Sequence, residues 1–457
     1  MPKEHVASVL VALAVVVGAA HLLGQIFARL RQPKLVGEIL AGVVIGPFVL
    51  GRIAPELSAK VLGAPGAGAG EAVRATLGFL NQLGLLLLMF ISGSEARRIL
   101  AKENRKPTAW ILAVGTPLPF CLALALGAVL PVDALAGPNG EGAPIRLVLA
   151  IAVAVTSIPV ISRIFYDLKI LHTRFAGLIL GAALIEDIAL WGVLAVATAL
   201  GATAAAGGAA GLSAGDVEHI LVTIGFMAGG LFVAPAVLRR LHDFRWNLVK
   251  EASPTGYATL ILVGYAAVAA HFGVEPAFAA FLAGFGLVGG FSGSQRSRFA
   301  EPLDAIKKVG TGVFVPIYFA MVGAKLKFGE GFSPAIFLAF LFGSSILCFS
   351  AIGLASRLAG FRGLEIVNLA VASNARGGPG IVLASVAYEA QLINGAFFTA
   401  LVLTAVLTSQ VAGAWLGLVL RRGWTLLRDD MPDLRASAAS EAEALVSASS
   451  SETMATR

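Results

Sequence analysis

The sequence predicts an all-α polytopic membrane protein, and three observations support that fold class. The 457 residues are 57% hydrophobic and only 13% charged, whereas soluble domains carry about a quarter charged residues. Apolar runs of about 18 residues or more, each long enough to cross a bilayer, recur as far as residue 421. The loops between them alternate between many and few basic residues. We therefore expect one transmembrane domain over residues 1–428, not a soluble enzyme.

Thirteen stretches are candidates for membrane-spanning helices. The first follows MPKEHVASVL without a small-residue cleavage pattern, so we interpret it as a helix and not as a signal peptide. The second and ninth are short and rich in glycine, and the tenth begins with the amphipathic segment EPLDAIKK. In chain order the stretches are 5–28, 35–51, 73–95, 108–131, 145–166, 173–201, 215–239, 254–272, 275–292, 303–324, 333–357, 363–387 and 393–420.

The basic residues of the loops predict the orientation. With thirteen spans, 24 Lys and Arg residues fall on one side and seven on the other. Positive charge collects in cytoplasmic loops, so we expect an N-terminus outside and a C-terminus in the cytoplasm, in a cell (inner) membrane. An even number of spans would break this alternation. The net charge of +7 is then a matter of topology and does not indicate a nucleic-acid partner.

The chain ends in an Ala-, Ser- and Glu-rich segment without aromatic residues, which predicts a disordered cytoplasmic tail over 429–457. It has no glycine-rich nucleotide fingerprint, so we expect no nucleotide-binding regulatory domain in this chain. The two cysteines, Cys121 and Cys348, lie inside apolar runs and form no metal-binding pattern. We therefore expect no bound cofactor.

Two spans contain helix breakers. The fifth reads VAVTSIPVISR, in which Pro159 removes a backbone donor and follows the hydroxyls of Thr156 and Ser157. The twelfth reads VASNARGGPGIVL, with Asn374 and Arg376 beside four consecutive breakers. Backbone unwinds at bilayer depth only where protein or water satisfies it. We expect both breaks to line a cavity, although a plain proline kink is the alternative for the fifth span.

The two breaks are seven spans apart, so their helices run in opposite directions. Spans 4–6 and 11–13 thus resemble an inverted repeat, each with a broken middle member, and crossed broken helices hold the substrate sites of secondary transporters. We expect a core over about 108–201 and 303–420. Arg376 and Asn374 would compensate the charge of the half-helix ends there.

An acidic pair interrupts the apolar segment GAALIEDIALW of the sixth span. An ionised carboxylate at the bilayer centre costs about 2.5–3.5 kcal/mol, so Glu186 and Asp187 require compensation. Adjacent helical residues point about 100° apart. We predict that Asp187 faces the cavity with Thr156 and Ser157, while Glu186 pairs with Arg376. A purely structural ion pair would explain one carboxylate but not two.

These segments resemble the monovalent cation:proton antiporter-2 family, which includes bacterial sodium/proton and potassium/proton exchangers and plant cation/proton exchangers. The resemblance extends from about Lys34 to Leu420. Its motifs are PKLVGEILAGVVIGP (33–47), LGLLLLMFISGSE (83–95), VTSIPVISRIFYDLKIL (155–171), the acidic pair, EPAFAAFLAGF (275–285), VPIYFAMVGAKL (315–326) and NARGG (374–378). No single motif is very specific, but their order and spacing are.

The resemblance implies a sodium/proton antiporter-like fold with a core domain, a dimerisation domain and elevator-like alternating access, and hence a homodimer. It also implies that Asp187, Thr156 and Ser157 bind the metal ion, Na+ or K+, with Glu186 where relatives carry Asp, Asn or Gln. Electrogenic relatives have a lysine near the position of Cys348, which this chain lacks. Its role is absent or passes to Arg376, so the stoichiometry stays open.

The sequence therefore predicts a secondary-active antiporter of Na+ or K+ and H+, in which Asp187 binds either the cation or a proton. Two alternatives remain. A sodium-coupled symporter could use Arg376 to bind the carboxylate of an organic anion. A cation channel or ion-sensing membrane protein would conduct or bind ions without responding to a proton gradient. No Ser-His-Asp arrangement, paired CxxC or phosphate loop indicates an enzyme.

Overall fold

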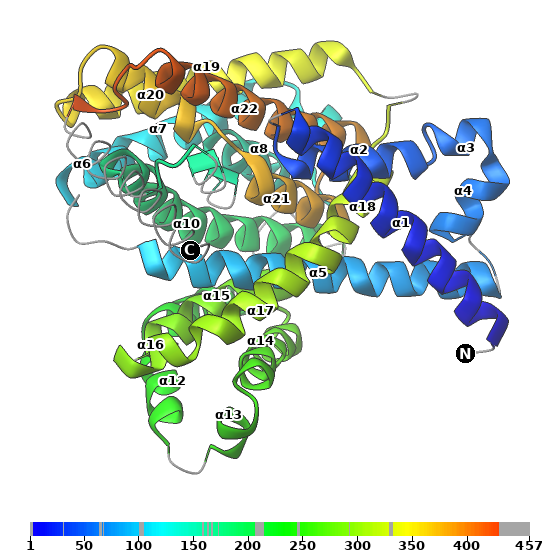
Figure 1. The fold of residues 1–457 in the computed structure, drawn as a ribbon. Helices are drawn as coiled ribbons and strands as arrows, with labels where there is room; N and C mark the ends of the chain where they lie inside the picture. The colour runs from blue at the N-terminus through cyan, green and yellow to red at the C-terminus, as the bar shows by residue number, and fades with distance from the viewer. Residues whose placement is uncertain are drawn as a thin grey trace, which may run out of the picture.

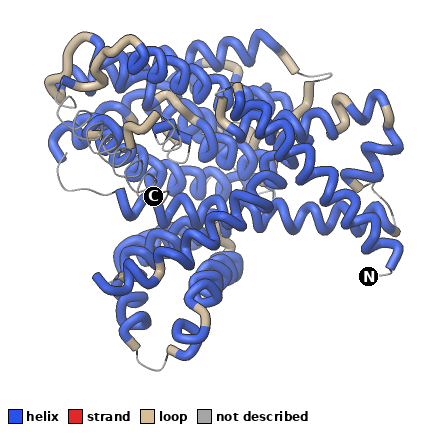
Figure 2. The backbone as a smooth tube through the Cα atoms, viewed as in Figure 1, coloured by secondary structure: helices blue, strands red, loops and turns tan. Residues whose placement is uncertain are grey.

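The structure is a computed structural model. It describes residues 3–30, 32–63, 66, 68–99, 105–157, 160–161, 164–165, 168–171, 173–205, 214–244, 247–291, 293–328 and 332–428. These residues are almost entirely helical, and Figure 2 shows no strand among them. One isolated antiparallel bridge joins Ala136 to Ile393. The predicted tail over 429–457 lies outside the described residues. The all-α prediction is confirmed.

Eight of the longer described helices are unbroken, and several of them are visible in Figure 1. They are α1 (Lys3–Arg29), α2 (Lys34–Ile45), α5 (Ala69–Ile99), α10 (Arg174–Ala205), α14 (Pro254–His271), α15 (Pro276–Gly290), α19 (Pro334–Leu358) and α22 (Gly395–Arg421). Among the described residues, nine helical stretches are long and apolar enough to cross a membrane, and two shorter helices are also apolar. A polytopic membrane protein is confirmed, while the exact number of thirteen spans stays a prediction.

Three further helical stretches each contain one π-helical turn in their middle. The stretches are α6 (Arg105–Trp110), η2 (Ile111–Gly115) and α7 (Pro117–Val129); α11 (Ala214–Ala228), η4 (Gly229–Val233) and α12 (Ala234–Asp243); and α17 (Ala300–Val309), η5 (Gly310–Phe314) and α18 (Val315–Lys325). In each stretch a proline follows two residues after the π turn: Pro117, Pro235 or Pro316. A proline ring collides with the carbonyl four residues earlier, and the wider π turn makes room for it.

The helices pack into two groups. The first contains α1, α2, α5, α12, α14, α15 and α18, and the second contains α7, α8, α10 and α19–α22. Glycines bring the backbones of the first group together: a Cβ on Gly42 would lie 1.8 Å from the Ala320 oxygen, and one on Gly323 would lie 1.9 Å from the Ile39 oxygen. Small residues permit such close crossings in membrane bundles. Thus α18 packs closely with α2, and the predicted division into core and scaffold stays a prediction.

The two groups meet where α10 packs against α5, and polar side chains also join α18 to α21 along a line that we name the α18–α21 seam. The Tyr318 hydroxyl lies 3.4 Å from that of Ser385 on α21. Two turns further along α18, Lys325 pairs with Glu389 at 2.7 Å. The predicted topology places this end of the bundle outside.

Two helices of the second group are broken or interrupted. The helix α8 (Ala143–Ala154) stops before an extended segment at 155–157, and helical residues resume at 160–161. The helices α20 (Leu364–Ser373) and α21 (Gly377–Glu389) are separated at 374–376. Both interruptions fall where the sequence predicts them. Pro159 itself lies outside the described residues.

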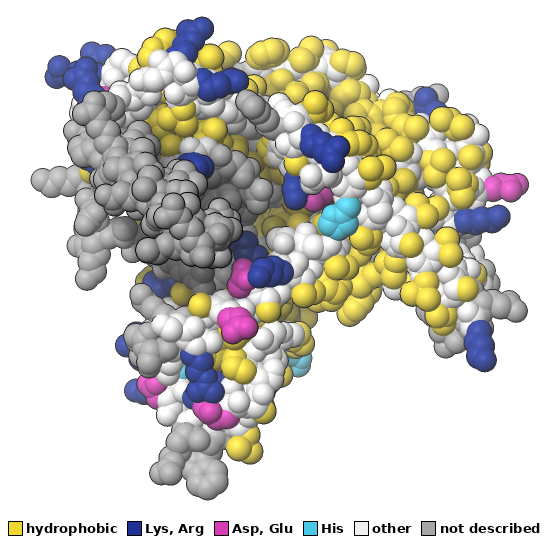
Figure 3. All heavy atoms as spheres, viewed as in Figure 1, with side chains coloured by type: hydrophobic (Ala, Val, Ile, Leu, Met, Phe, Trp, Pro, Cys, Tyr) yellow, Lys and Arg dark blue, Asp and Glu magenta, His cyan; other side chains and the backbone are white. Residues whose placement is uncertain are grey.

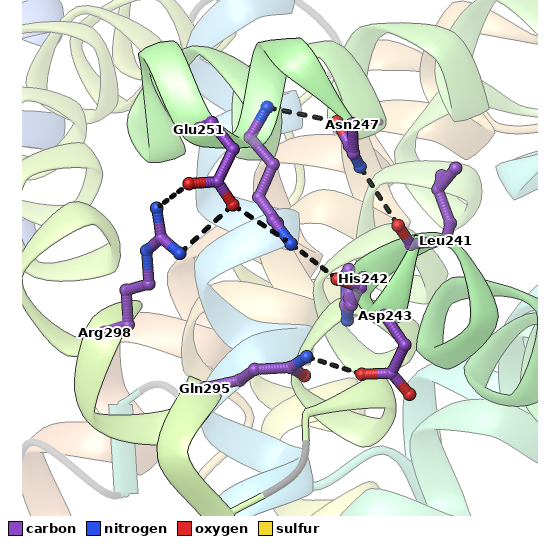
Figure 4. A network of polar contacts seen from close by, with 8 residues as sticks. Leu241, His242, Asp243, Asn247, Glu251, Gln295 and Arg298 are labelled. Carbon is purple, nitrogen blue, oxygen red and sulfur yellow. Dashed lines mark hydrogen bonds and ion pairs between the residues drawn. The ribbon is translucent and has the colours of Figure 1, made fainter. Parts of the chain in front are cut away.

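A smaller lobe at the bottom of Figure 1 contains α12, α14, the short helix α13 (Leu248–Ala252) and α16 (Gly293–Arg298). Figure 4 shows the polar network that fixes its connections. Asn247 caps α13, the Lys250 ammonium donates to the His242 carbonyl at 2.6 Å, and Arg298 donates to both oxygens of Glu251. Exposed ion pairs of this kind stabilise a fold only weakly, because water and salt screen them.

The surface divides by polarity. In Figure 3 a broad hydrophobic face covers the upper right of the molecule, while basic and acidic side chains gather on the lower lobe. Exposed large apolar side chains also occur on lipid-length helices, such as Leu10 and Leu22 on α1, Phe342 on α19 and Val411 on α22. Large exposed apolar areas of this kind suit a lipid environment and not water.

Candidate functional site

The two interruptions cross each other and exchange backbone hydrogen bonds. The Ser157 amide donates to the Ala375 carbonyl at 2.7 Å, and the Thr156 hydroxyl donates to the Ser373 carbonyl at 2.7 Å. Gly377 has a φ of +31°, and a Cβ there would lie 2.7 Å from the Ser157 hydroxyl and closer still to Val160. Only glycine therefore allows this crossing. The unwound backbone is satisfied within the protein, as bilayer depth requires.

The Arg376 guanidinium compensates the carbonyl end of α8. Its nitrogens donate to the Val153 carbonyl at 3.4 Å and to the Ser344 hydroxyl of α19 at 2.7 Å. The side chain is 2% exposed and lies over the Phe340 ring at 5.6 Å. A cation is favourable at a helix C-terminus, where the partial charge is negative. Arg376 therefore stabilises the crossing of the two broken helices.

The amide ends of the broken helices have hydroxyl partners. The Val160 amide donates to the Ser157 hydroxyl at 3.3 Å, as at a helix N-cap. The Gly377 amide donates to the Ser409 hydroxyl of α22 at 3.1 Å, and the Arg376 amide donates to Thr408 at 3.4 Å. Neutral hydroxyl oxygens thus cap the positive ends of these helices. In the described part of the chain, these three amides do not donate to a carboxylate.

The acidic pair lies buried on α10, with Glu186 and Asp187 each 3% exposed. The Thr116 hydroxyl donates to Oε1 of Glu186 at 2.5 Å. The Thr156 hydroxyl also lies within hydrogen-bonding range of that carboxylate. Oε2 of Glu186 and Oδ1 of Asp187 accept no hydrogen bond from the residues that the structure describes. Buried carboxylate oxygens are costly without a partner. Both oxygens could therefore accept a proton or contact a cation.

The structure brings together most of the predicted site residues. Thr156 lies by the Glu186 carboxylate, and Ser157 joins the same crossing. Asn374 accepts from Arg376 at 3.4 Å and donates to Ser345 at 3.2 Å. Which of them bind an ion stays a prediction.

The expected pair of Glu186 with Arg376 is not formed in the described chain. Arg376 instead donates to Ser344, Val153 and Asn374, because the negative helix end at α8 lies within its reach, and its Nε has no partner among the described residues. Sequence reasoning also missed Thr116 and Ser344. Gly115 followed by Thr116 and Pro117 in mid-span was a signal that could have revealed Thr116, since such a triplet disturbs a regular helix.

The oxygen-rich character of the site suits a small hard cation. Carboxylate and hydroxyl oxygens surround the crossing, and hard metal ions prefer oxygen ligands. The described residues contain no group of three or more His, Cys, Asp and Glu side chains that would hold a metal ion.

Known proteins resemble this chain along most of its length. Cation/H(+) antiporter 18 of Arabidopsis thaliana is 25% identical over 87% of this chain and 47% of its own length. Na(+)/H(+) antiporter NhaS4 of Synechocystis is 25% identical over 88% of this chain and 94% of its own length. Na(+)/H(+)-K(+) antiporter GerN of Bacillus cereus is 25% identical over 87% and 93%. The chain thus spans about half the length of the plant relative.

The fold is shared with a solved structure. The sodium proton antiporter MjNhaP1 from Methanocaldococcus jannaschii superposes with a TM-score of 0.61 at 14% identity, covering 91% of this chain and 98% of the other. The family model described as sodium/hydrogen exchanger, transmembrane, matches residues 11–422. This family consists of transporters and not of enzymes. The chain belongs to the sodium/hydrogen exchanger family.

Proposed function

We propose that this protein exchanges a monovalent cation, Na+ or K+, for H+ across a cell membrane. The observation that supports this most is the buried pair on α10, in which Oδ1 of Asp187 receives no hydrogen bond from the described residues, while the crossing of the two broken helices packs against α10. The names of its relatives include both Na(+)/H(+) and K(+)/H(+) antiporters. A site of this kind gives no preference between the two cations, because selectivity depends on cavity size at the sub-ångström scale.

Coupling follows from competition for one carboxylate. Asp187 binds either the cation or a proton, and the Thr156 and Ser157 oxygens complete the ion's shell. Because Asp187 is buried, an unoccupied ionised carboxylate would be costly, so the loaded states cross the membrane and the empty state does not. Ion binding on one side thereby requires proton release on that side.

Alternating access exposes this site to one side at a time. The crossing would move with α7, α8, α10 and α19–α22 relative to the helices packed around α5 and α18. We propose the same orientation as above, with the N-terminus outside and the C-terminus in the cytoplasm. A homodimer formed through the other helices is likewise a proposal.

The contacts of Arg376 count against the symporter alternative. Its Nη1 and Nη2 already donate to Ser344, Val153 and Asn374, and Nε is the guanidinium nitrogen without a partner among the described residues, so a bidentate contact with an organic carboxylate would have to replace one of these bonds. No described feature favours a channel over an exchanger.

The test is exchange by the purified protein in proteoliposomes that contain a pH-sensitive dye. An imposed pH gradient should collapse on addition of the transported cation, titrated as Li+, Na+, K+ and Rb+. Flux that ignores the proton gradient would establish a channel instead. Uptake of an organic anion together with Na+ would establish a symporter.

Voltage separates the possible stoichiometries. One proton exchanged for one cation is electroneutral, whereas a second proton released from Glu186 makes exchange electrogenic. A potential of 100 mV is worth about 2.3 kcal/mol per charge. We expect Na+/H+ exchange in valinomycin-clamped liposomes to be insensitive to voltage. Rates that change several-fold would place Glu186 in the proton pathway.

A further inference from the structure

We propose that the protein binds the phosphate of an anionic phospholipid in a basic cavity at one end of the α18–α21 seam. The site is formed by residues other than the acidic pair and the crossing, so the inference goes beyond ion exchange and does not depend on it. The predicted topology places this end of the bundle outside, and the lipid would then belong to the outer leaflet.

The cavity has a volume of about 410 Å³, within the range of about 300–1,000 Å³ that is usual for ligand pockets. The loop after α2 and the short helix α3 (Leu50–Ile53) form one wall, and the end of α18 with the loop that follows it forms another. Among its lining residues are three basic and three aromatic side chains: Arg52, Lys325 and Lys327, and Phe48, Phe328 and Tyr388.

The positive charge of this cavity is only partly compensated. Lys325 pairs with Glu389 at 2.7 Å, whereas Arg52 and Lys327 form no ion pair with a residue that the structure describes. Basic side chains that gather without acidic partners attract anions, and phosphate oxygens accept hydrogen bonds from both Arg and Lys. The cavity therefore suits a phosphate group.

Contacts within the protein hold two of the basic residues in place. The Arg52 guanidinium lies over the Phe48 ring at 4.8 Å, and Phe48 packs on Phe328 with ring centroids 5.0 Å apart. The Lys327 amide donates to the Thr399 hydroxyl of α22 at 2.9 Å. A guanidinium stacked on a ring keeps the N–H groups at its edge for a bidentate contact with phosphate. Because the donors are arranged before the ligand arrives, binding costs less conformational entropy.

The surroundings of the cavity favour a phospholipid over free phosphate. Val44 in the last turn of α2 and Ile53 at the end of α3 are 41% and 78% exposed, so apolar side chains that suit acyl chains flank the segment that lines the cavity. Aromatic side chains gather where a bundle meets the lipid headgroups. Phe328 continues such a cluster to Phe332 and to Phe337 of α19, with ring centroids 6.0 and 6.2 Å apart.

Both helix groups contribute to the cavity. Phe48 follows α2 of the first group, whereas Tyr388 belongs to α21 of the second group and stacks on Phe398 of α22, with ring centroids 4.8 Å apart. The site is therefore complete only when the two groups lie as they do in this structure. A lipid bound there would favour this arrangement, because a ligand stabilises the state that binds it better.

The test titrates the purified protein in detergent with dioctanoyl phosphatidylglycerol and follows the melting temperature. A ligand of the folded state raises the melting temperature as its concentration exceeds its Kd, so we expect a saturable rise. Dioctanoyl phosphatidylcholine, whose choline group adds a positive charge, should bind more weakly, and inorganic phosphate at the same concentration should not raise the melting temperature. An equal effect of phosphatidylcholine would contradict recognition by charge, and an equal effect of inorganic phosphate would contradict a lipid site.

Substitutions test the residues themselves. Arg52→Gln and Lys327→Gln should each weaken the apparent affinity for phosphatidylglycerol about fivefold, the effect of one basic residue near an anionic headgroup. Lys327→Arg should retain the affinity, because the charge remains. The matched control is Lys60→Gln on α4 (Pro55–Leu62), an exposed lysine that the predicted topology places at the same end and that does not line the cavity. It should leave the affinity unchanged.

Two further results would overturn the inference. One is the absence of saturable stabilisation by phosphatidylglycerol. The other is an equal loss of affinity in Lys60→Gln and Lys327→Gln, which would indicate attraction to the basic surface in general. Both are measured as binding to the folded protein, so a failure of the proposed ion exchange is distinguishable from a failure of the lipid site.

Discussion

Asp187 combines full burial with an oxygen that receives no hydrogen bond from the described residues. The change Asp187→Asn removes the charge while it keeps the shape of the side chain. We expect exchange to be abolished at every pH, and the protein to express and melt like the original. Dye-based flux and a thermal melt in detergent measure both properties. Substantial residual exchange at any pH would remove Asp187 from the mechanism.

Arg376 gives a second prediction at the scale of residues. Its partners are Ser344, Val153 and Asn374, and it makes no ion pair with Glu186 in the described chain. Arg376→Gln should therefore lower the melting temperature, because hydrogen bonds to charged groups contribute about 1.5–3 kcal/mol. In a double-mutant cycle, Glu186→Gln and Arg376→Gln should lose stability additively, within about 0.5 kcal/mol. If the double variant were less destabilised than the sum of the two single variants, Glu186 and Arg376 would interact directly, as an ion pair does.

At the scale of elements, the α2–α18 crossing depends on a close approach of two backbones. A Cβ on Gly323 would lie 1.9 Å from the Ile39 oxygen, so Gly323→Ala must force the helices apart. Overpacking of this kind costs about 1–3 kcal/mol. We expect a lower melting temperature, measured by thermal denaturation in detergent.

The control for that prediction is Gly343→Ala on α19, where an added Cβ would have no neighbour within 4 Å. It should be neutral or slightly stabilising, since alanine is the better helix former. Equal melting temperatures for the two variants would show that the crossing tolerates a methyl group.

The breaks in the two helices could be predicted from the sequence, but the contacts that they make could not. Both breaks are visible in it, because four consecutive breakers beside Arg376 and a proline after Thr156 and Ser157 leave few other conformations. The choice of partner for Arg376 is not visible, because it depends on which helix end lies within reach in three dimensions. Sequence reasoning missed Thr116 as a site residue for a related reason. The π turn before it determines where its hydroxyl points, and the sequence does not show that turn. The packing of α18 with α2 depends on glycines in two distant segments.

At the scale of the whole molecule, the α18–α21 seam must break if the two helix groups move past each other. Lys325 and Glu389 pair at 2.7 Å with about a third or more of each side chain exposed. Such pairs contribute about 0.2–1 kcal/mol, which corresponds to a shift of up to about fivefold in the population of the open form. Glu389→Gln should therefore lower the apparent KM for cation added from the outer face, by about two- to fivefold.

A charge exchange controls this prediction. The double variant Lys325→Glu with Glu389→Lys should return the KM to its original value, and Lys308→Met, which removes an ion pair within α17, should leave it unchanged. Oriented vesicles measure the constant from each face. An identical constant for Glu389→Gln and the original protein would mean that the pair does not keep this end closed.

The crossing at Ser157 and Ala375 has a consequence for biosynthesis. Residues of α8 and α10 leave the ribosome long before the segment around Ala375 exists. At about 5–20 residues per second, α10 waits roughly ten seconds or more for α20 and α21. During that interval two acidic side chains sit in the bilayer beside an unfinished core. Thr116 and Thr156 precede the pair in the chain, so the hydroxyls that lie at Glu186 are already present when α10 is made.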